Sequence, residues 1–183
     1  MQLTEIVNSF TKTINIINSL LEKDVIKDYA LIGGLALSAW IKPRTTQDID
    51  IIVLISEDYK WKDFIDILKK NYRKQVFKPK PARDATIKEM ISFTVGPIEV
   101  DLINTREFPL ATDCIKNAIP VTVFKQKVKV ATPEYLILLK LISGSEQDII
   151  DIKNLLKVAN KSQVKKIARK YLLEPKLKER MAW

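Results

Sequence analysis

The sequence predicts an α/β (α+β) fold with a mixed central sheet that is flanked by helices and followed by a C-terminal helical part. Apolar residues recur at steps of three and four near the start of the chain and after residue 132, which is typical of amphipathic helices. Between these regions, β-branched and alternating apolar segments separated by Gly and Pro are typical of strands and turns. We therefore expect an α/β core with an N-terminal helix over residues 1–131 and a helical subdomain over residues 132–183.

The part of the chain up to residue 71 alternates helical and extended patterns. Gly33-Gly34 interrupts a short apolar run, and Pro43 must end the helix that follows, because proline lacks the amide hydrogen that a helix interior needs. The β-branched segment before residue 56 predicts a central strand. In order, we expect a helix over 4–21, a strand over 29–32, a helix over 35–41, a strand over 49–55 and a helix over 59–71.

Two hairpins are expected next, and helices after them. Gly96-Pro97 separates two alternating segments and predicts a tight turn, and residues 125–127 divide a second pair. Pro133 suits the first turn of a helix, where its missing N–H has no hydrogen bond to lose. We expect strands over 90–95, 98–103, 119–124 and 128–130, then a helix opened by Pro133, a helix over 146–158 and two shorter helices.

Composition limits the chemistry that the chain can use. Its 183 residues suit one domain, or one domain with a helical extension, and 46% hydrophobic residues can build a core without a disulfide or a structural metal. A single cysteine, Cys114, excludes an internal disulfide and a cysteine zinc cluster. The sequence has no histidine, which removes every histidine-dependent triad and metal site. Catalysis would therefore depend on carboxylates, lysine, hydroxyl groups and a bound metal.

Charge favours a polyanionic partner. The 31 basic and 22 acidic residues give a net charge of +9, which raises the encounter rate with nucleic acids and nucleotides. A lysine-rich solvated surface is the alternative interpretation. The N-terminus lacks the basic start of a signal peptide, and no apolar run reaches the ~18 residues of a membrane span. We expect a cytoplasmic protein without a membrane partner.

Two aspartates at the start of the predicted central strand are the first candidate site. Asp48 and Asp50 are two residues apart, so the pleat places both carboxylates on one face and turns Ile49 into the core. Two adjacent carboxylates repel each other unless a cation lies between them. A divalent metal resolves this conflict, and Mg²⁺ prefers a few carboxylates together with substrate phosphate oxygens. The alternative is a pair of aspartates at a strand edge in solvent.

A third carboxylate is expected on a later strand. Asp101 lies within the alternating segment 98–103, and it would approach Asp48 and Asp50 if the two strands were neighbours. Three such aspartates can hold two metals that stabilise the attacking and leaving oxygens of a phosphoryl displacement. Asp101 could also accept the proton of the nucleophile. Glu99 points the same way and is the competing candidate, although we favour Asp101.

The glycine pair predicts a phosphate site. Gly33 and Gly34 lie between a predicted strand and a predicted helix, where glycine lets the backbone approach a phosphate and the helix start offers free N–H groups. As a plain turn, the pair would need no ligand. The thirteen residues between Gly34 and Asp48 make the combination more specific than either motif alone.

These motifs together resemble the polymerase-beta-type nucleotidyltransferase superfamily. Within it, the chain is most similar to the AbiEii/MenT-like nucleotidyltransferases, which include toxins of toxin–antitoxin and abortive-infection systems. The resemblance covers residues 28–158. It is carried by Gly33-Gly34, by Arg44-x-Thr46-x-Asp48-Ile49-Asp50, by Asp101, by the run from Ala131 to Lys140 and by the run from Asp148 to Ile152. It implies a nucleotidyltransferase fold and the transfer of a nucleoside monophosphate from an NTP to an acceptor hydroxyl.

The resemblance also implies roles for these residues. Asp48 and Asp50 would hold two Mg²⁺ ions, with Mn²⁺ as an alternative, and Asp101 would complete the metal site. The other candidates for catalysis or nucleotide binding are Gly33, Gly34, Ser38, Arg44, Thr46, Lys140 and Asp148. Lys140 would face the triphosphate, and Asp148 would lie near the active site.

Structural alternatives exist for several of these candidates. Lys140 could be a surface lysine whose stem lies along the apolar helix, and Asp148 and Asp151 could simply favour a helix N-terminus. Arg44 and Thr46 could brace the loop before the strand without touching a ligand. Ser38 could reach phosphate through its hydroxyl or be packed.

The acceptor is expected to be RNA, with a tRNA 3′ end as the first choice. This hypothesis rests on the net charge and on the basic residues Lys69, Lys70, Lys74, Lys78, Lys80 and Arg83. Transfer to a protein or a small molecule is the second hypothesis. A non-catalytic nucleotide-binding module is the third, although three clustered acids have no structural purpose there. An antitoxin is a further partner that the resemblance implies.

Overall fold

The computed structural model describes residues 3–44, 46, 48–72, 78–79 and 87–181. Its centre is a mixed sheet with the strand order β3-β4-β5-β2-β1-β7-β6. Strands β2 and β5 are parallel, as are β1 and β7, whereas the remaining neighbours are antiparallel. The strands are β1 (Ile26–Ile32), β2 (Asp48–Ile55), β3 (Lys78–Pro79), β4 (Met90–Val95), β5 (Ile98–Asn104), β6 (Ile119–Val123) and β7 (Gln126–Val130).

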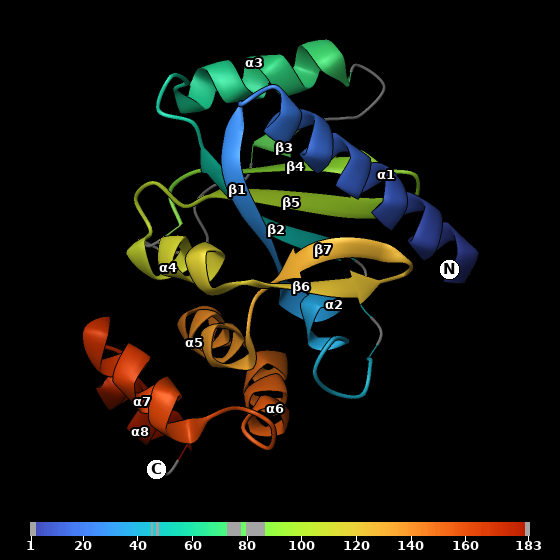
Figure 1. Ribbon diagram of the computed structural model, residues 1–183. Coiled ribbons are helices and arrows are strands. Elements are labelled where there is room, and N and C mark those ends of the chain that lie inside the picture. Colours follow the sequence, from blue (N-terminus) through green and yellow to red (C-terminus); the bar gives the residue numbers. More distant parts are fainter. Residues whose placement is uncertain (1–2, 45, 47, 73–77, 80–86, 182–183) are drawn as a thin grey trace.

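Helices surround this sheet. Helix α1 packs across β1, β4, β5 and β7, whereas α2 and α4 contact β1 and β2. The helices that follow the last strand gather at the end of the molecule away from α3 (Figure 1). The helices are α1 (Leu3–Glu22), α2 (Gly33–Leu37), α3 (Trp61–Asn71), α4 (Pro109–Asn117), α5 (Pro133–Ser143), α6 (Glu146–Leu155), α7 (Lys161–Lys170) and α8 (Glu174–Met181).

The predicted mixed α/β fold is confirmed, with local differences. The helix expected over 35–41 is wrong in extent, because α2 ends at Leu37 and the chain continues in tight turns whose amides mostly bond to carbonyls three residues back. The second hairpin turns at Phe124 and Lys125, both with positive φ, so β7 begins at Gln126 rather than at 128. Helix α4 was not predicted from the sequence.

Strand β2 lies at the heart of the core. Its neighbours are β1 and β5, and Ile49 and Ile51 on one face are fully buried. Asp48, Asp50 and Ile52 face the other way, toward α2 and α5. Buried apolar residues from α5, α6 and α7 belong to the same hydrophobic cluster as the sheet. The division of the chain at residue 131 therefore stays a prediction.

The predicted basic stretch can be placed only in part, and the prediction that no segment spans a membrane can be compared with the described helices. Lys74, Lys80 and Arg83 of the basic stretch lie outside the described residues, and of Lys78 only the backbone is described. Among the helices that are described, none combines the length and the apolar character needed to cross a bilayer.

Candidate active site

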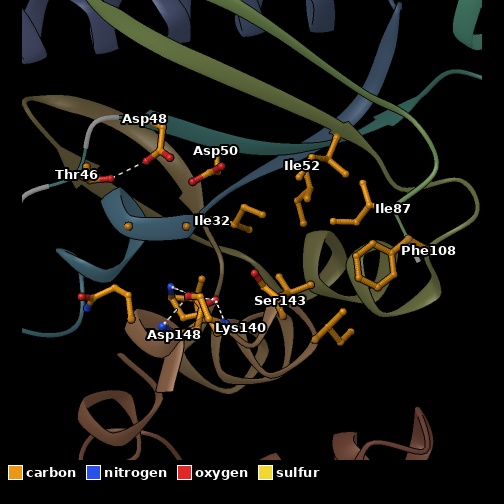
Figure 2. Close-up of a pocket in the computed structure, with 18 of the residues that line it drawn as sticks. Ile32, Thr46, Asp48, Asp50, Ile52, Ile87, Phe108, Lys140, Ser143 and Asp148 are labelled. Atoms are coloured by element: carbon orange, nitrogen blue, oxygen red, sulfur yellow. Dashed lines mark hydrogen bonds and ion pairs between the residues drawn. The ribbon is translucent and has the colours of Figure 1, made fainter. Parts of the chain in front are cut away.

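A pocket of about 740 Å³ opens between β2, α2 and the helices α5 and α6. This volume is within the usual range of small-molecule sites. Figure 2 shows Asp48 and Asp50 across the pocket from Lys140 and Asp148, with Ile52, Ile87 and Phe108 at the other end. The lining residues are Ile32, Gly33, Gly34, Arg44, Thr46, Asp48, Asp50, Ile52, Ile87, Ile103, Phe108, Leu136, Leu139, Lys140, Ile142, Ser143, Ser145, Gln147 and Asp148.

Asp48 and Asp50 are the first residues of β2 to face this pocket. Both are half-buried and line it, whereas Ile49 between them is 1% exposed on the opposite face, as the pleat requires. Asp50 is paired in register with Ile32 of β1 and with Asp101 of β5. The expected arrangement of two carboxylates on one face is therefore present.

The glycine pair packs closely against β2, the strand that carries Asp48 and Asp50, and against the loop before it. Gly33 has φ +68°, and a Cβ built on it would lie 1.9 Å from Asp50 Oδ2. A Cβ on Gly34 would lie 2.5 Å from Thr46 Oγ1. Larger residues would displace Asp50 or Thr46 from these positions. The fixed spacing between Gly33-Gly34 and the aspartates thus reflects contact between the two motifs.

The two candidate residues in the loop before β2, Arg44 and Thr46, both form side-chain hydrogen bonds that hold the loop in place. Thr46 Oγ1 donates a hydrogen bond of 2.7 Å to Asp48 Oδ1, which orients that carboxylate. The Arg44 guanidinium donates to Asp151 through Nε at 3.0 Å and through a terminal nitrogen at 2.8 Å. Both residues also line the pocket, so bracing and ligand contact are compatible.

Lys140 is held between two carboxylates. Its side chain is only 9% exposed, and Nζ lies 2.8 Å from Asp148 Oδ1 and 2.7 Å from Asp151 Oδ2. The alternative of a lysine with its charge in solvent is therefore wrong. Asp148 also accepts hydrogen bonds from the backbone N–H and the hydroxyl of Ser145, which closes a capping box at the start of α6.

Asp151 is the member of this group that sequence reasoning did not propose. Its side chain is 2% exposed and binds both Arg44 and Lys140, which are far apart in the sequence. A usable signal existed: Asp148 and Asp151 are three residues apart, so a helix places them on one face. The partner Arg44 could not be inferred, because 107 residues separate the two.

Three predicted candidates do not line the pocket. Asp101 is fully buried beside Asp50 and accepts a hydrogen bond from Ser92 Oγ. Glu99, its competitor, is exposed and is paired in register with Asp48. Ser38 donates its hydroxyl to the Leu35 carbonyl at 2.7 Å. Of the predicted site, the structure thus gathers the glycines, Arg44, Thr46, Asp48, Asp50, Lys140 and Asp148 around one cavity.

The charges around the cavity are uneven. Arg44 and Lys140 are matched by Asp148 and Asp151, so that side of the site is neutral. Asp48 and Asp50 place two carboxylates on the opposite side. Within the described residues no group of three or more acidic, cysteine or histidine side chains is gathered to hold a metal. A pair of carboxylates is nevertheless the usual protein contribution to Mg²⁺, whose other ligands are waters and phosphate oxygens.

The pKa values of Asp148 and Asp151 lie below their ordinary range. Burial raises the pKa of Asp148, but hydrogen bonds from Lys140 and Ser145 outweigh burial and lower it. Burial likewise raises the pKa of Asp151, and the hydrogen bonds from Arg44 and Lys140 outweigh it. Both carboxylates are therefore ionised in the folded protein at neutral pH.

Stability should fall in acid, and less steeply in Asp148→Asn. A carboxyl with a lowered folded pKa stabilises the fold above its unfolded pKa of ~3.9, and the stabilisation is lost as the pH falls through the folded value. Urea unfolding between about pH 5 and pH 2 measures this slope. Equal slopes for the variant and the natural protein would show that Asp148 contributes nothing to acid sensitivity.

Solved structures share this fold. An antigenic nucleotidyltransferase-like protein from Paracoccidioides brasiliensis matches 100% of this chain and 94% of its own, at 17% identity and a TM-score of 0.58. The antibiotic-resistance factor ANT(2″)-Ia in its solution structure matches 99% of this chain and 95% of its own, at 13% identity and a TM-score of 0.58. These likenesses confirm the predicted nucleotidyltransferase fold. No curated protein sequence matches the chain.

The sequence profile of the nucleotidyl transferase AbiEii toxin family, type IV toxin–antitoxin system, matches residues 18–181. The chain belongs to the AbiEii family. This AbiEii-family protein is therefore a nucleotidyltransferase, an enzyme that transfers a nucleoside monophosphate from an NTP, and the predicted resemblance is confirmed. Because the family is one of toxin–antitoxin systems, it implies an antitoxin as a partner.

Proposed function

We propose that this enzyme transfers a nucleoside monophosphate from a Mg²⁺-bound NTP to an RNA hydroxyl, with a tRNA 3′ end as the first candidate. The observation that carries the nucleotide part is the pocket itself. It brings the carboxylates of Asp48 and Asp50 opposite the ammonium group of Lys140, with Gly33 and Gly34 beside them. Such a site suits a ligand that carries both metal ions and phosphates.

The donor set fits Mg²⁺, and Mn²⁺ is the alternative ion. Asp48 and Asp50 would hold the metal, because their oxygens face the pocket from one side of β2. When bound, divalent ions supply neutralisation of the phosphates and of the charge that develops on the reacting oxygens. Without such ions, the acidic side of the pocket would repel a triphosphate. We therefore propose that NTP and metal bind together.

The chain's own residues would position the nucleotide. Thr46 holds the Asp48 carboxylate in place through its hydrogen bond. Lys140 has two of its three N–H donors directed at carboxylates and lines the pocket, so one donor can meet a phosphate oxygen. Asp101, beside Asp50 on β5, is the proposed third carboxylate, and it accepts a hydrogen bond from Ser92.

The acceptor is the less constrained part of the proposal. The net charge of +9 supports RNA, because phosphate contacts by lysine and arginine supply most of the affinity for nucleic acid. A small-molecule or protein acceptor is the second candidate. It is favoured by the apolar end of the pocket, where Ile52, Ile87 and Phe108 offer an uncharged surface.

A transfer screen tests the acceptor. The protein is incubated with each of the four α-³²P-labelled NTPs and Mg²⁺, together with total RNA, with protein extract or with no added acceptor. Label on RNA supports the proposal, whereas label on protein, or on the enzyme itself, supports the second candidate. No label in any arm would favour a nucleotide-binding module without transferase activity, and would contradict the proposed reaction.

NTP should protect the fold only when a divalent metal is present. A ligand that binds the folded state alone stabilises it by ~2.7 kcal/mol at a hundredfold excess over its Kd. We expect a rise in Tm with Mg²⁺ and NTP together, and little or none with NTP and EDTA. Protection by NTP in EDTA would contradict the coupled binding of NTP and metal. The Asp50→Asn protein is the matched control, and its Tm should rise little with Mg²⁺ and NTP.

A further inference from the structure

Asp151 receives donors from three side chains that belong to three separate parts of the chain. Arg44 in the loop before β2 donates two hydrogen bonds to it, and Lys140 of α5 lies 2.7 Å from Oδ2. Gln147, one turn earlier on α6, donates to Oδ1 at 3.1 Å. These four interactions match the roughly four acceptor positions that an ionised carboxylate offers.

This saturation decides what Asp151 can do. A carboxylate whose acceptor positions are filled cannot also bind a metal or take a proton from a substrate. Asp151 is also 2% exposed and does not line the pocket. Both of its cationic partners, Arg44 and Lys140, do line it. The carboxylate can therefore affect the site only through the cations that it holds.

We infer that Asp151 is a positioning residue for nucleotidyl transfer, which fixes Arg44 and Lys140 relative to each other and to the acidic strand. The inference rests on the proposed function. Arg44 is two residues before Thr46, and Thr46 orients Asp48, so the contact ties α6 to the metal-binding end of β2. Lys140 is fixed from its second side by Asp148, which the Ser145 cap anchors.

Loss of the Asp151 charge should make the positions of the Arg44 and Lys140 side chains less fixed, while both residues still line the pocket. The Arg44 side chain is 35% exposed, and the substitution removes the charge of the carboxylate to which its guanidinium donates two hydrogen bonds. Lys140 would keep Asp148 alone and would lose the contact that centres it. Because transfer depends on groups held to within a fraction of an ångström, small displacements of this kind lower the rate strongly.

The test compares Asp151→Asn with Asp28→Asn. Asp28 forms a partly buried ion pair of 2.5 Å with Lys129 and is not among the residues that line the pocket, so its variant controls for the loss of a carboxylate and an ion pair. Tm, kcat/KM for transfer and the binding of magnesium tripolyphosphate are measured for each protein, well below its Tm. We expect Asp151→Asn to lose roughly a hundredfold in kcat/KM and to bind tripolyphosphate more weakly, whereas Asp28→Asn changes neither.

A double variant separates positioning from a general structural role. If Asp151 acts through Arg44, the combination Arg44→Gln/Asp151→Asn should lose little more activity than Asp151→Asn alone. If the loss of kcat/KM in the double variant equals the product of the losses in the two single variants, the two residues act independently, and the coupling between them is overturned. A folded Asp151→Asn protein with natural kcat/KM and natural tripolyphosphate binding would overturn the inference altogether.

The two proposals fail in different ways. If the natural protein transfers no nucleotide to any acceptor, the proposed function fails, and tripolyphosphate binding still tests the positioning role. If the natural protein is active and Asp151→Asn is equally active, the inference alone fails. Asp151→Glu adds a second variant that keeps the charge but moves it by one methylene, and we expect it to restore binding in part.

Discussion

Replacing Asp50 with Asn is expected to abolish nucleotidyl transfer while the fold stays intact, and Asp48→Asn should have the same effect. Each substitution removes a carboxylate charge from the acidic side of the pocket and keeps the side-chain volume. The loss of a metal ligand in such a site costs several kcal/mol of transition-state stabilisation, which corresponds to about a thousandfold in rate. Transfer from labelled NTP and Tm are measured together.

The stability of these variants gives an independent check. Asp48 and Asp50 lie on one face of β2, so their charges repel each other when no cation is bound. Without Mg²⁺, the Tm of either variant should therefore equal or slightly exceed that of the natural protein. Asp66→Asn, on the exposed surface of α3, is the control and should keep full activity. Full activity in Asp48→Asn or Asp50→Asn would remove the metal-site assignment.

Local patterns explain why part of the site was predictable. The two-residue spacing of Asp48 and Asp50 sets their common face as soon as the segment is recognised as a strand, because the pleat has a period of two. Gly33 was predictable as a special backbone position from its place between a strand and a helix. In both cases the deciding information lies within a few residues.

The remainder depends on contacts between distant parts of the chain. The pairing of Arg44 with Asp151 follows from how α6 packs beside the loop before β2, and no local pattern encodes it. The burial of Asp101 follows from the position of β5 between β2 and β4, where Ser92 supplies its hydrogen bond. Lys140 was matched through the family resemblance, but its two carboxylate partners emerged only from the packing of α5 on α6.

Alanine at Gly33 should be almost as damaging to transfer as the loss of Asp50. Gly33 adopts φ +68°, and its added Cβ would lie 1.9 Å from Asp50 Oδ2 and 2.8 Å from Asp50 Cβ. Because the Asp50 Cβ is fixed to the strand, a rotation of the carboxylate alone does not relieve the overlap. Asp50 or the turn must move, and the geometry of the acidic pair changes with it.

Gly96→Ala is a closely matched control for this substitution. Gly96 has φ +62° in the turn between β4 and β5, so alanine there meets the same left-handed backbone penalty of ~1–2 kcal/mol. Among the residues that the structure describes, its Cβ would approach only Ser9 Oγ, at 2.8 Å, and Gly96 is not one of the residues that line the pocket. Both variants should lose thermal stability, but only Gly33→Ala should lose transfer, by about a hundredfold or more. Equal activity of the two variants, assayed well below both Tm values, would show that contact between Gly33 and Asp50 does not set the geometry of the acidic pair.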